Sequence, residues 1–187
     1  MKILAIVGSL REMSFNKALA LRAQKMLAKR HPEVEFTILD WSGVPLLNQD
    51  IEFPAPDEVF RVREEIKAAD GIWIFSPEYN HGIPGVLKNL LDWMSRPQGE
   101  GKGQVMRGKP IALSGTTPGM GAALQAQDSL VTLLSLLRTE IMNAPRLAIP
   151  HIEQQMENGA LLLNESESYL EKQADAFIAF IESRKAL

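Results

Sequence analysis

A polar segment at residues 8–16 follows the apolar run at residues 3–7 and carries groups that suit a phosphate. Arg11 offers a planar guanidinium that can donate parallel hydrogen bonds to phosphate oxygens. A helix that begins at the end of this segment would add unpaired backbone N–H groups and the positive end of its dipole. The segment therefore indicates an anion site. The alternative is an ordinary strand-to-helix turn in which Ser14 is the helix N-cap.

A second polar segment, residues 76–85, follows the apolar run at residues 71–75. Its two prolines and two glycines shape the backbone, and Pro84 suits the first turn of a following helix. Tyr79 supplies a flat ring, and Asn80 supplies both a donor and an acceptor. Such a loop suits the edge of a planar heterocycle, because loops on a rigid scaffold often carry function. A structural turn with a packed tyrosine is the alternative.

A third segment, residues 114–121, follows the apolar run at residues 110–113. Its three glycines would let the backbone approach a ligand closely, and its hydroxyl groups would add polar contacts. Taken alone, it fits a flexible connection between a strand and a helix slightly better than a ligand site.

The elements that position these segments alternate along the chain. Nearly continuous apolar runs are typical of strands that are covered on both faces, as in a parallel sheet. The runs lie at residues 3–7, 34–39, 71–75 and 110–113 and, less clearly, 141–149. Apolar residues at helical spacing lie between and after them, around residues 18–26, 59–69, 87–94, 130–137 and 170–181. Ser168 and Glu171 form a capping-box pattern that predicts the start of the last helix.

This alternation predicts an α/β fold, a doubly wound five-stranded parallel sheet with helices on both faces. Residues 1–187 are expected to form a single domain, with the glycine-rich stretch at residues 98–104 as a loop insertion. In such sheets ligands bind beyond the carboxyl ends of the strands, where the strand order reverses. The three polar segments occupy that position.

Composition excludes several classes of function. The formal net charge is −3 and no dense basic run is present, so nucleic-acid binding is not expected. The chain has no cysteine, which excludes disulfides, thiolate nucleophiles and cysteine-ligated metals. The histidines are too far apart in sequence to suggest a metal site. No apolar stretch is long enough to be a signal sequence or to cross a membrane, and we expect a cytoplasmic protein.

Together, the polar segments resemble the NADPH-dependent FMN reductase family, which includes bacterial quinone, azo-dye and chromate reductases. The resemblance covers nearly the whole chain. It is carried by Gly8-Ser9-Leu10-Arg11 with Ser14 and Asn16, by Pro77-Glu78-Tyr79-Asn80, by Pro84-Gly85-Val86-Leu87-Lys88-Asn89, and by Asp92-Trp93. Many members have a Gly-Gly pair at the end of the third segment, where this chain has Gly121-Ala122.

The resemblance implies a flavodoxin-like fold with strand order 2-1-3-4-5, FMN as cofactor, and a homodimer or homotetramer with each flavin near a subunit boundary. By this resemblance the FMN phosphate would be held by Ser9, Arg11, Ser14, Phe15 and Asn16. The isoalloxazine ring would be lined by Pro77, Glu78, Tyr79 and Asn80. Its other edge would face Ser114, Gly115 and Thr116.

The implied activity is that of an oxidoreductase. A hydride would pass from NADPH or NADH to the flavin, and two electrons would then pass to a quinone-like or other small acceptor. No side chain needs to act as a nucleophile or essential base, so no catalytic residue is predicted. The main alternative is a non-enzymatic electron carrier, a flavodoxin proper. Arg11 favours the reductase, since carriers use a phosphate loop rich in hydroxyl groups and without an arginine. A module that kept the fold and lost the cofactor is a further alternative.

Overall fold

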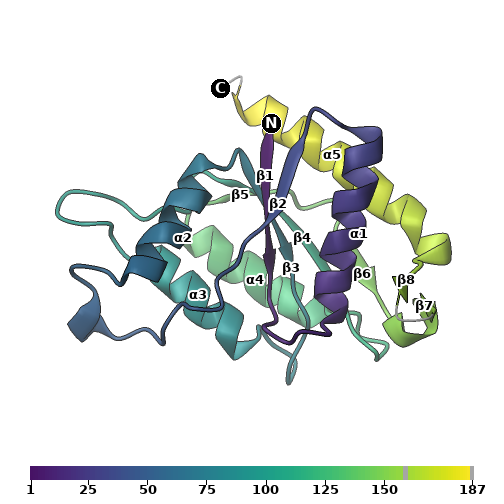
Figure 1. Ribbon diagram of the computed structural model, residues 1–187, viewed down its shortest axis with the longest axis horizontal. Helices are drawn as coiled ribbons and strands as arrows, with labels where there is room; N and C mark the ends of the chain where they lie inside the picture. The colour runs from purple at the N-terminus through teal and green to yellow at the C-terminus, as the bar shows by residue number, and fades with distance from the viewer. Residues whose placement is uncertain (158–159, 186–187) are drawn as a thin grey trace.

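A computed structural model describes residues 1–157 and 160–185 and shows a parallel sheet between two layers of helices (Figure 1). Neighbouring strands follow the order β2-β1-β3-β4-β5, and β6 also pairs with β4. The strands are β1 (Lys2–Val7), β2 (Glu35–Ile38), β3 (Gly71–Phe75), β4 (Pro110–Thr116), β5 (Glu140–Ile141) and β6 (Leu147–Ile149). The strand order predicted from the resemblance is confirmed.

Five helices cover the sheet: α1 (Phe15–Arg30), α2 (Asp57–Ala68), α3 (Gly85–Ser95), α4 (Leu124–Leu136) and α5 (Glu167–Lys185). α1 and α5 pack on one face and α2, α3 and α4 on the other, as Figure 1 shows. Short 3-10 turns lie at η1 (Gln49–Ile51), η2 (Ile152–Gln155) and η3 (Asn164–Ser166). A small antiparallel pair, β7 (Met156–Glu157) and β8 (Ala160–Leu161), precedes α5.

The two hydrophobic cores follow from strand periodicity. Along β1, Ile3, Ala5 and Val7 face α1 and α5, whereas Leu4 and Ile6 face the other helices. Because both faces are covered, every residue of the central strand β3 is buried. This arrangement explains why the strands are nearly continuous runs of apolar residues.

The register of the central strands places the three polar segments side by side. Val7 of β1 pairs with Phe75 of β3, and Phe75 pairs with Ser114 of β4. These residues lie at or close to the carboxyl ends of their strands, so the connections that follow all start at the same end of the sheet, which we call the carboxyl edge. That edge is the lower one in Figure 1.

Two sequence-based boundaries were wrong. The expected strand at 141–149 is divided into β5 and β6, which pair with different parts of β4. Pro145, which has no N–H to donate to a ladder, lies between them. The last helix begins at Glu167, directly after η3, so Ser168 lies inside the helix rather than at its N-cap. Within the described residues, none of the helices combines the length and apolarity that a membrane crossing needs.

Candidate functional site

A cavity of about 270 Å³, here called the edge cavity, lies where the three polar segments meet. Of the twelve residues expected at the site, it is lined by all except Asn80, Ser114 and Gly115. Three further residues complete its wall. The lining residues are Ser9, Arg11, Ser14, Phe15, Asn16, Pro77, Glu78, Tyr79, Thr116, Thr117, Pro118 and Glu153.

The start of α1 directs an array of donors into the edge cavity. Ser14 is the helix N-cap, as the simpler interpretation of this segment predicted, and its Oγ accepts from the N–H of Lys17 at 3.3 Å. Its own hydroxyl hydrogen is left to donate. Phe15 and Asn16 form the first turn of the helix, and within the described residues their N–H groups have no protein acceptor. Helix capping and anion binding are therefore compatible here.

Arg11 adds a positive charge on the same side. Its guanidinium carbon lies 5.1 Å from the centroid of the Phe15 ring, and no carboxylate of the described residues forms an ion pair with it. Ser9 accepts from the N–H of Arg11 at 3.3 Å, which fixes the turn that presents this side chain. An unpaired guanidinium beside free N–H groups is the arrangement expected of a phosphate site.

Asn16 has a different role from the one that its polarity suggested. Its Nδ2 donates to the carbonyl oxygen of Thr116 at 3.0 Å, and its Oδ1 accepts from the N–H of Thr116 at 3.1 Å. Both residues are buried. The side-chain amide is therefore engaged with the end of β4 and fixes the cavity wall, whereas the backbone N–H of Asn16 has no acceptor among the described residues.

The second segment forms a tight turn. Tyr79 and Gly82 exchange two backbone hydrogen bonds of 3.2 and 3.0 Å, and Asn80 and His81 between them have φ of 50° and 59°. These angles are those of a type I′ turn, in which asparagine is well tolerated. Asn80 lies at the tip of this turn, outside the cavity lining, whereas Tyr79 lines the cavity and stays half exposed.

Glu78 joins the second segment to α4. Its Oε2 accepts from the N–H groups of Gln125 and Ala126, at 3.0 and 3.1 Å. The N-cap residue of α4 is Ala123, whose side chain cannot cap a helix, so the carboxylate of Glu78 takes over that function from another loop. Glu78 Oε1 also lies 3.4 Å from Nδ1 of His81. Glu78 thereby fixes the second and third segments relative to each other.

The third segment begins later than its composition suggested, because β4 continues to Thr116. Ser114 is buried inside the sheet, where its Oγ accepts from Nε1 of Trp73 at 2.8 Å and donates to Oε1 of Gln173 at 2.6 Å. A side chain at Gly115 would lie 2.6 Å from the carbonyl oxygen of Ser76. Both residues thus serve internal packing, and the cavity is lined instead by Thr116, Thr117 and Pro118.

Sequence reasoning missed Glu153, which comes from η2 and lines the edge cavity. Two backbone hydrogen bonds bring η2 to the third segment, from Ile152 to Thr117 at 3.2 Å and from His151 to Gly119 at 3.4 Å. Glu153 lies 37 positions after Thr116 in a stretch without a motif, so no signal in one sequence could have found it.

Comparisons with known proteins agree with this architecture. A sequence model of the NADPH-dependent FMN reductase family matches residues 1–154. A 2-hydroxy-1,4-benzoquinone reductase from a Burkholderia species is 38% identical, over 99% of this chain and 98% of its own length. An NAD(P)H-dependent FMN reductase from Pseudomonas aeruginosa is 35% identical, over 94% and 92%. Among solved structures, the flavoenzyme NAD(P)H:(acceptor) oxidoreductase FerB from Paracoccus denitrificans has a TM-score of 0.84 and 33% identity, and the match covers 98% of both chains.

Proposed function

This chain belongs to the NADPH-dependent FMN reductase family, and we propose that its edge cavity is the FMN site of an NAD(P)H-dependent quinone reductase. An enzyme that uses FMN and NAD(P)H is what the family and the full-length relatives show. The observation that carries the assignment of the cavity is its donor array. Unpaired N–H groups at the start of α1 lie beside the unpaired guanidinium of Arg11, at the edge where the strand order reverses.

The residues present fit the phosphate of FMN. The backbone N–H groups of Phe15 and Asn16, the hydroxyl groups of Ser9 and Ser14 and the guanidinium of Arg11 would donate to its oxygens. Gly8 supports this turn, because a side chain there would lie 2.9 Å from Leu87 and 3.1 Å from Ser76. The absence of a side chain at Gly8 therefore lets the start of the first segment pack closely against the second segment and α3.

The ring of FMN would lie between the second and third segments. Pro77 and Tyr79 supply one wall, and Thr116, Thr117 and Pro118 supply the other. Asn16 and Glu78 hold these walls in place from behind, through the hydrogen bonds described above. When bound, FMN would supply the redox chemistry, which is the transfer of a hydride from NAD(P)H and then of two electrons to a quinone-like acceptor. The protein would position the flavin, and the two substrates would reach it in turn.

We further propose that a second copy of the chain covers the ring. The edge cavity is about 270 Å³, near the lower end for small-molecule sites, so a tricyclic ring would extend out of it. Tyr79 in the cavity lining, Met120 in the third segment and Leu124 at the start of α4 carry large apolar side chains that are 50%, 82% and 48% exposed. Apolar groups gathered in this way mark interaction surfaces. Sedimentation of the FMN-loaded protein is expected to give a dimer or tetramer.

The test of function is anaerobic reduction. FMN-loaded protein is expected to lose its blue-light absorption band when NADPH or NADH is added, and to regain it when a benzoquinone follows. This outcome would also separate the reductase from the electron carrier, the alternative that the named relatives do not support. A bound flavin that resists both nucleotides, yet is bleached by dithionite, would contradict the proposal.

A further inference from the structure

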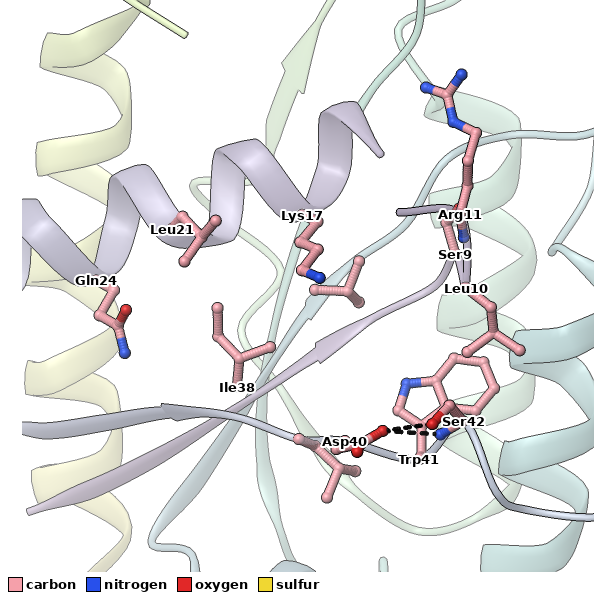
Figure 2. A pocket seen from close by; sticks show the side chains of 12 residues that line it. Ser9, Leu10, Arg11, Lys17, Leu21, Gln24, Ile38, Asp40, Trp41 and Ser42 are labelled. Atoms are coloured by element: carbon pink, nitrogen blue, oxygen red, sulfur yellow. Dashed lines mark hydrogen bonds between the residues drawn. The ribbon is translucent and has the colours of Figure 1, made fainter. Parts of the chain in front are cut away.

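A second cavity, of about 600 Å³, opens between α1 and the chain that leaves β2 (Figure 2). We call it the α1–β2 cavity. Its lining consists of Val7, Ser9, Leu10, Arg11, Lys17, Leu21, Gln24, Ile38, Leu39, Asp40, Trp41 and Ser42. Nothing in the flavin assignment above uses this space, although it is more than twice as large as the edge cavity.

Lys17 gives the α1–β2 cavity an unpaired positive charge. Its side chain points from the first turns of α1 into the space above Ile38, as Figure 2 shows, whereas the guanidinium of Arg11 turns away from that space. Within the described residues, no carboxylate lies within ion-pair distance of the Lys17 amine. An ammonium group in this position is suited to an anionic ligand.

Asp40 and Ser42 form the opposite, polar wall. One oxygen of Asp40, Oδ1, accepts from the N–H of Ser42 at 3.1 Å and from its hydroxyl at 2.8 Å. These hydrogen bonds, with Arg61 and Lys17 adding smaller attractions, hold the pKa of the Asp40 carboxyl below its ordinary value. Oδ2 has no protein donor among the described residues and can accept from a ligand hydroxyl.

The remaining walls are aliphatic. Leu10 and Leu21 are 49% and 40% exposed, and the half-buried Ile38 lies below Leu21 in Figure 2. One amine, one ionised carboxylate with a free oxygen, and exposed leucine side chains make three kinds of contact available. They match a phosphate, a hydroxylated sugar and a flat apolar base, which are the three parts of a phosphorylated nucleoside.

The two cavities meet at the first segment, since Ser9 and Arg11 line both of them. A pyridine nucleotide must bring its nicotinamide against the flavin, and its other half then needs a place nearby. A quinone acceptor carries no phosphate and would make no use of Lys17. The occupant that fits best is therefore the half of NAD(P)H that does not react.

We propose that the α1–β2 cavity binds the phosphorylated adenosine half of NAD(P)H. Lys17 pairs with a phosphate, Asp40 accepts from a ribose hydroxyl, and Leu21 and Ile38, which lie on the same side of Lys17 in Figure 2, contact the adenine. This assignment rests on the proposed function, because it takes the adjoining edge cavity as the flavin site. Lys17 is thus a residue that binds the nucleotide substrate and does not line the flavin cavity.

The test measures binding of two adenosine phosphates to FMN-loaded protein, by titration calorimetry and by the fluorescence of Trp41 at the cavity wall. Adenosine 2′,5′-bisphosphate and 5′-AMP are compared, so that binding through the 2′-phosphate and through the 5′-phosphate can be told apart. One molecule is expected to bind per chain. Lys17→Gln, which removes the charge and keeps a polar side chain that is one atom shorter, is expected to weaken binding about tenfold.

Two further variants make the result specific. Lys25→Gln removes an exposed lysine from the same helix outside the cavity and is expected to bind as the wild type does. Leu21→Trp adds bulk to an exposed cavity position and is expected to block binding without disturbing the core. Absence of binding to the wild type, or equal binding by Lys17→Gln and the wild type, would overturn the proposal.

Kinetics separate this proposal from the proposed function. Lys17→Gln is expected to raise the KM for NAD(P)H about tenfold, while FMN affinity and the rate at which a quinone reoxidises the pre-reduced protein stay unchanged. If the wild-type flavin is reduced by NAD(P)H and Lys17→Gln has the same KM, the cavity assignment alone fails. If no nucleotide reduces the wild-type flavin, the proposed function fails first.

Discussion

The side-chain amide of Asn16 pairs with both the N–H and the C=O of Thr116, a residue 100 positions away, and the pair is buried. This contact has the form of a peptide-to-peptide pairing and joins the start of α1 to the end of β4. The first and third segments therefore keep a fixed separation whether or not a ligand lies between them.

Replacing Asn16 with Ala is expected to leave two buried backbone groups of Thr116 without partners. We expect a loss of about 2–4 kcal/mol in the free energy of unfolding, since each unsatisfied buried group costs about 1–3 kcal/mol. Urea unfolding of the FMN-free protein measures this loss without any contribution from the ligand. Ser14→Ala, which removes the N-cap of the same helix, is the comparison and should cost about 1 kcal/mol. Equal stability of Asn16→Ala and the wild type would contradict the pairing.

Arg11 is expected to discriminate FMN from riboflavin. Because its guanidinium has no carboxylate partner in the described part of the chain, its removal should cost little stability and affect the phosphate alone. Arg11→Ala is expected to weaken FMN about tenfold or more, in line with a charge-assisted hydrogen bond, and to leave riboflavin affinity unchanged. Fluorescence titration of the FMN-free protein with each flavin provides the measurement. Equal weakening for both flavins would place Arg11 away from the phosphate.

The sequence was sufficient to predict the strands of the sheet and the position of the polar turn that follows the first strand. Strands β1, β3 and β4 are buried on both faces, so their apolar runs were unmistakable, and Arg11 and Ser14 followed one of them directly. The strand order came only from the resemblance, since hydrophobic periodicity does not specify which strands are neighbours.

The roles of single polar residues could not be predicted in this way. Three polar side chains have the chemistry of ligand-binding groups, yet each is hydrogen-bonded to a distant part of the protein. Asn16 pairs with Thr116, Glu78 with the N-terminus of α4, and Ser114 with Gln173. One sequence does not show which side chains the fold will bring together. Glu153 was missed for the same reason, because its place in the cavity depends on backbone bonds to the third segment.

Glu78→Gln tests the long-range cap on α4. The amide oxygen can still accept both hydrogen bonds, since both go to one oxygen of Glu78, but the negative charge at the helix N-terminus is lost, so we expect a decrease of about 1 kcal/mol in the free energy of unfolding. Glu153→Gln removes a carboxylate from the same cavity that, among the described residues, accepts no hydrogen bond from α4, and serves as the control. Thermal unfolding of both variants without flavin gives the comparison. A larger effect at Glu153 would show that cavity charge, rather than helix capping, dominates.

Ala122 is expected to be a site where glycine is better than alanine. Its φ is 51°, and Ala123 follows with 63°, so two consecutive side chains adopt the left-handed conformation. Because glycine adopts this conformation without steric cost, Ala122→Gly is expected to stabilise the protein by about 0.5–1 kcal/mol. The opposite sign is expected for Ala126→Gly, inside α4, where glycine is destabilising by about 1 kcal/mol. If Ala122→Gly lowers the melting temperature, the left-handed backbone is not retained in solution.

Asp175 is expected to link stability to acidic pH. Its carboxylate, on α5, contacts His31 at 2.8 Å and Arg30 at 2.9 Å, at the end of α1. The hydrogen bond from His31, followed by the attraction of Arg30, lowers the pKa of Asp175 below its ordinary value of 3.8. A carboxyl group with a lower pKa in the folded state contributes stability that is present above the unfolded-state pKa and is lost as the pH falls through the folded-state pKa.

The variant Asp175→Asn should therefore be less stable than the wild type at neutral pH, by at most about 1 kcal/mol because the pair is partly exposed. The difference between the two should shrink as the pH falls below 3.8, where the wild-type carboxyl also becomes neutral. Urea midpoints measured from pH 3 to 7 for both proteins provide the test. A difference that persists unchanged at the acidic end would mean that packing at Asp175, and not its charge, joins α1 to α5.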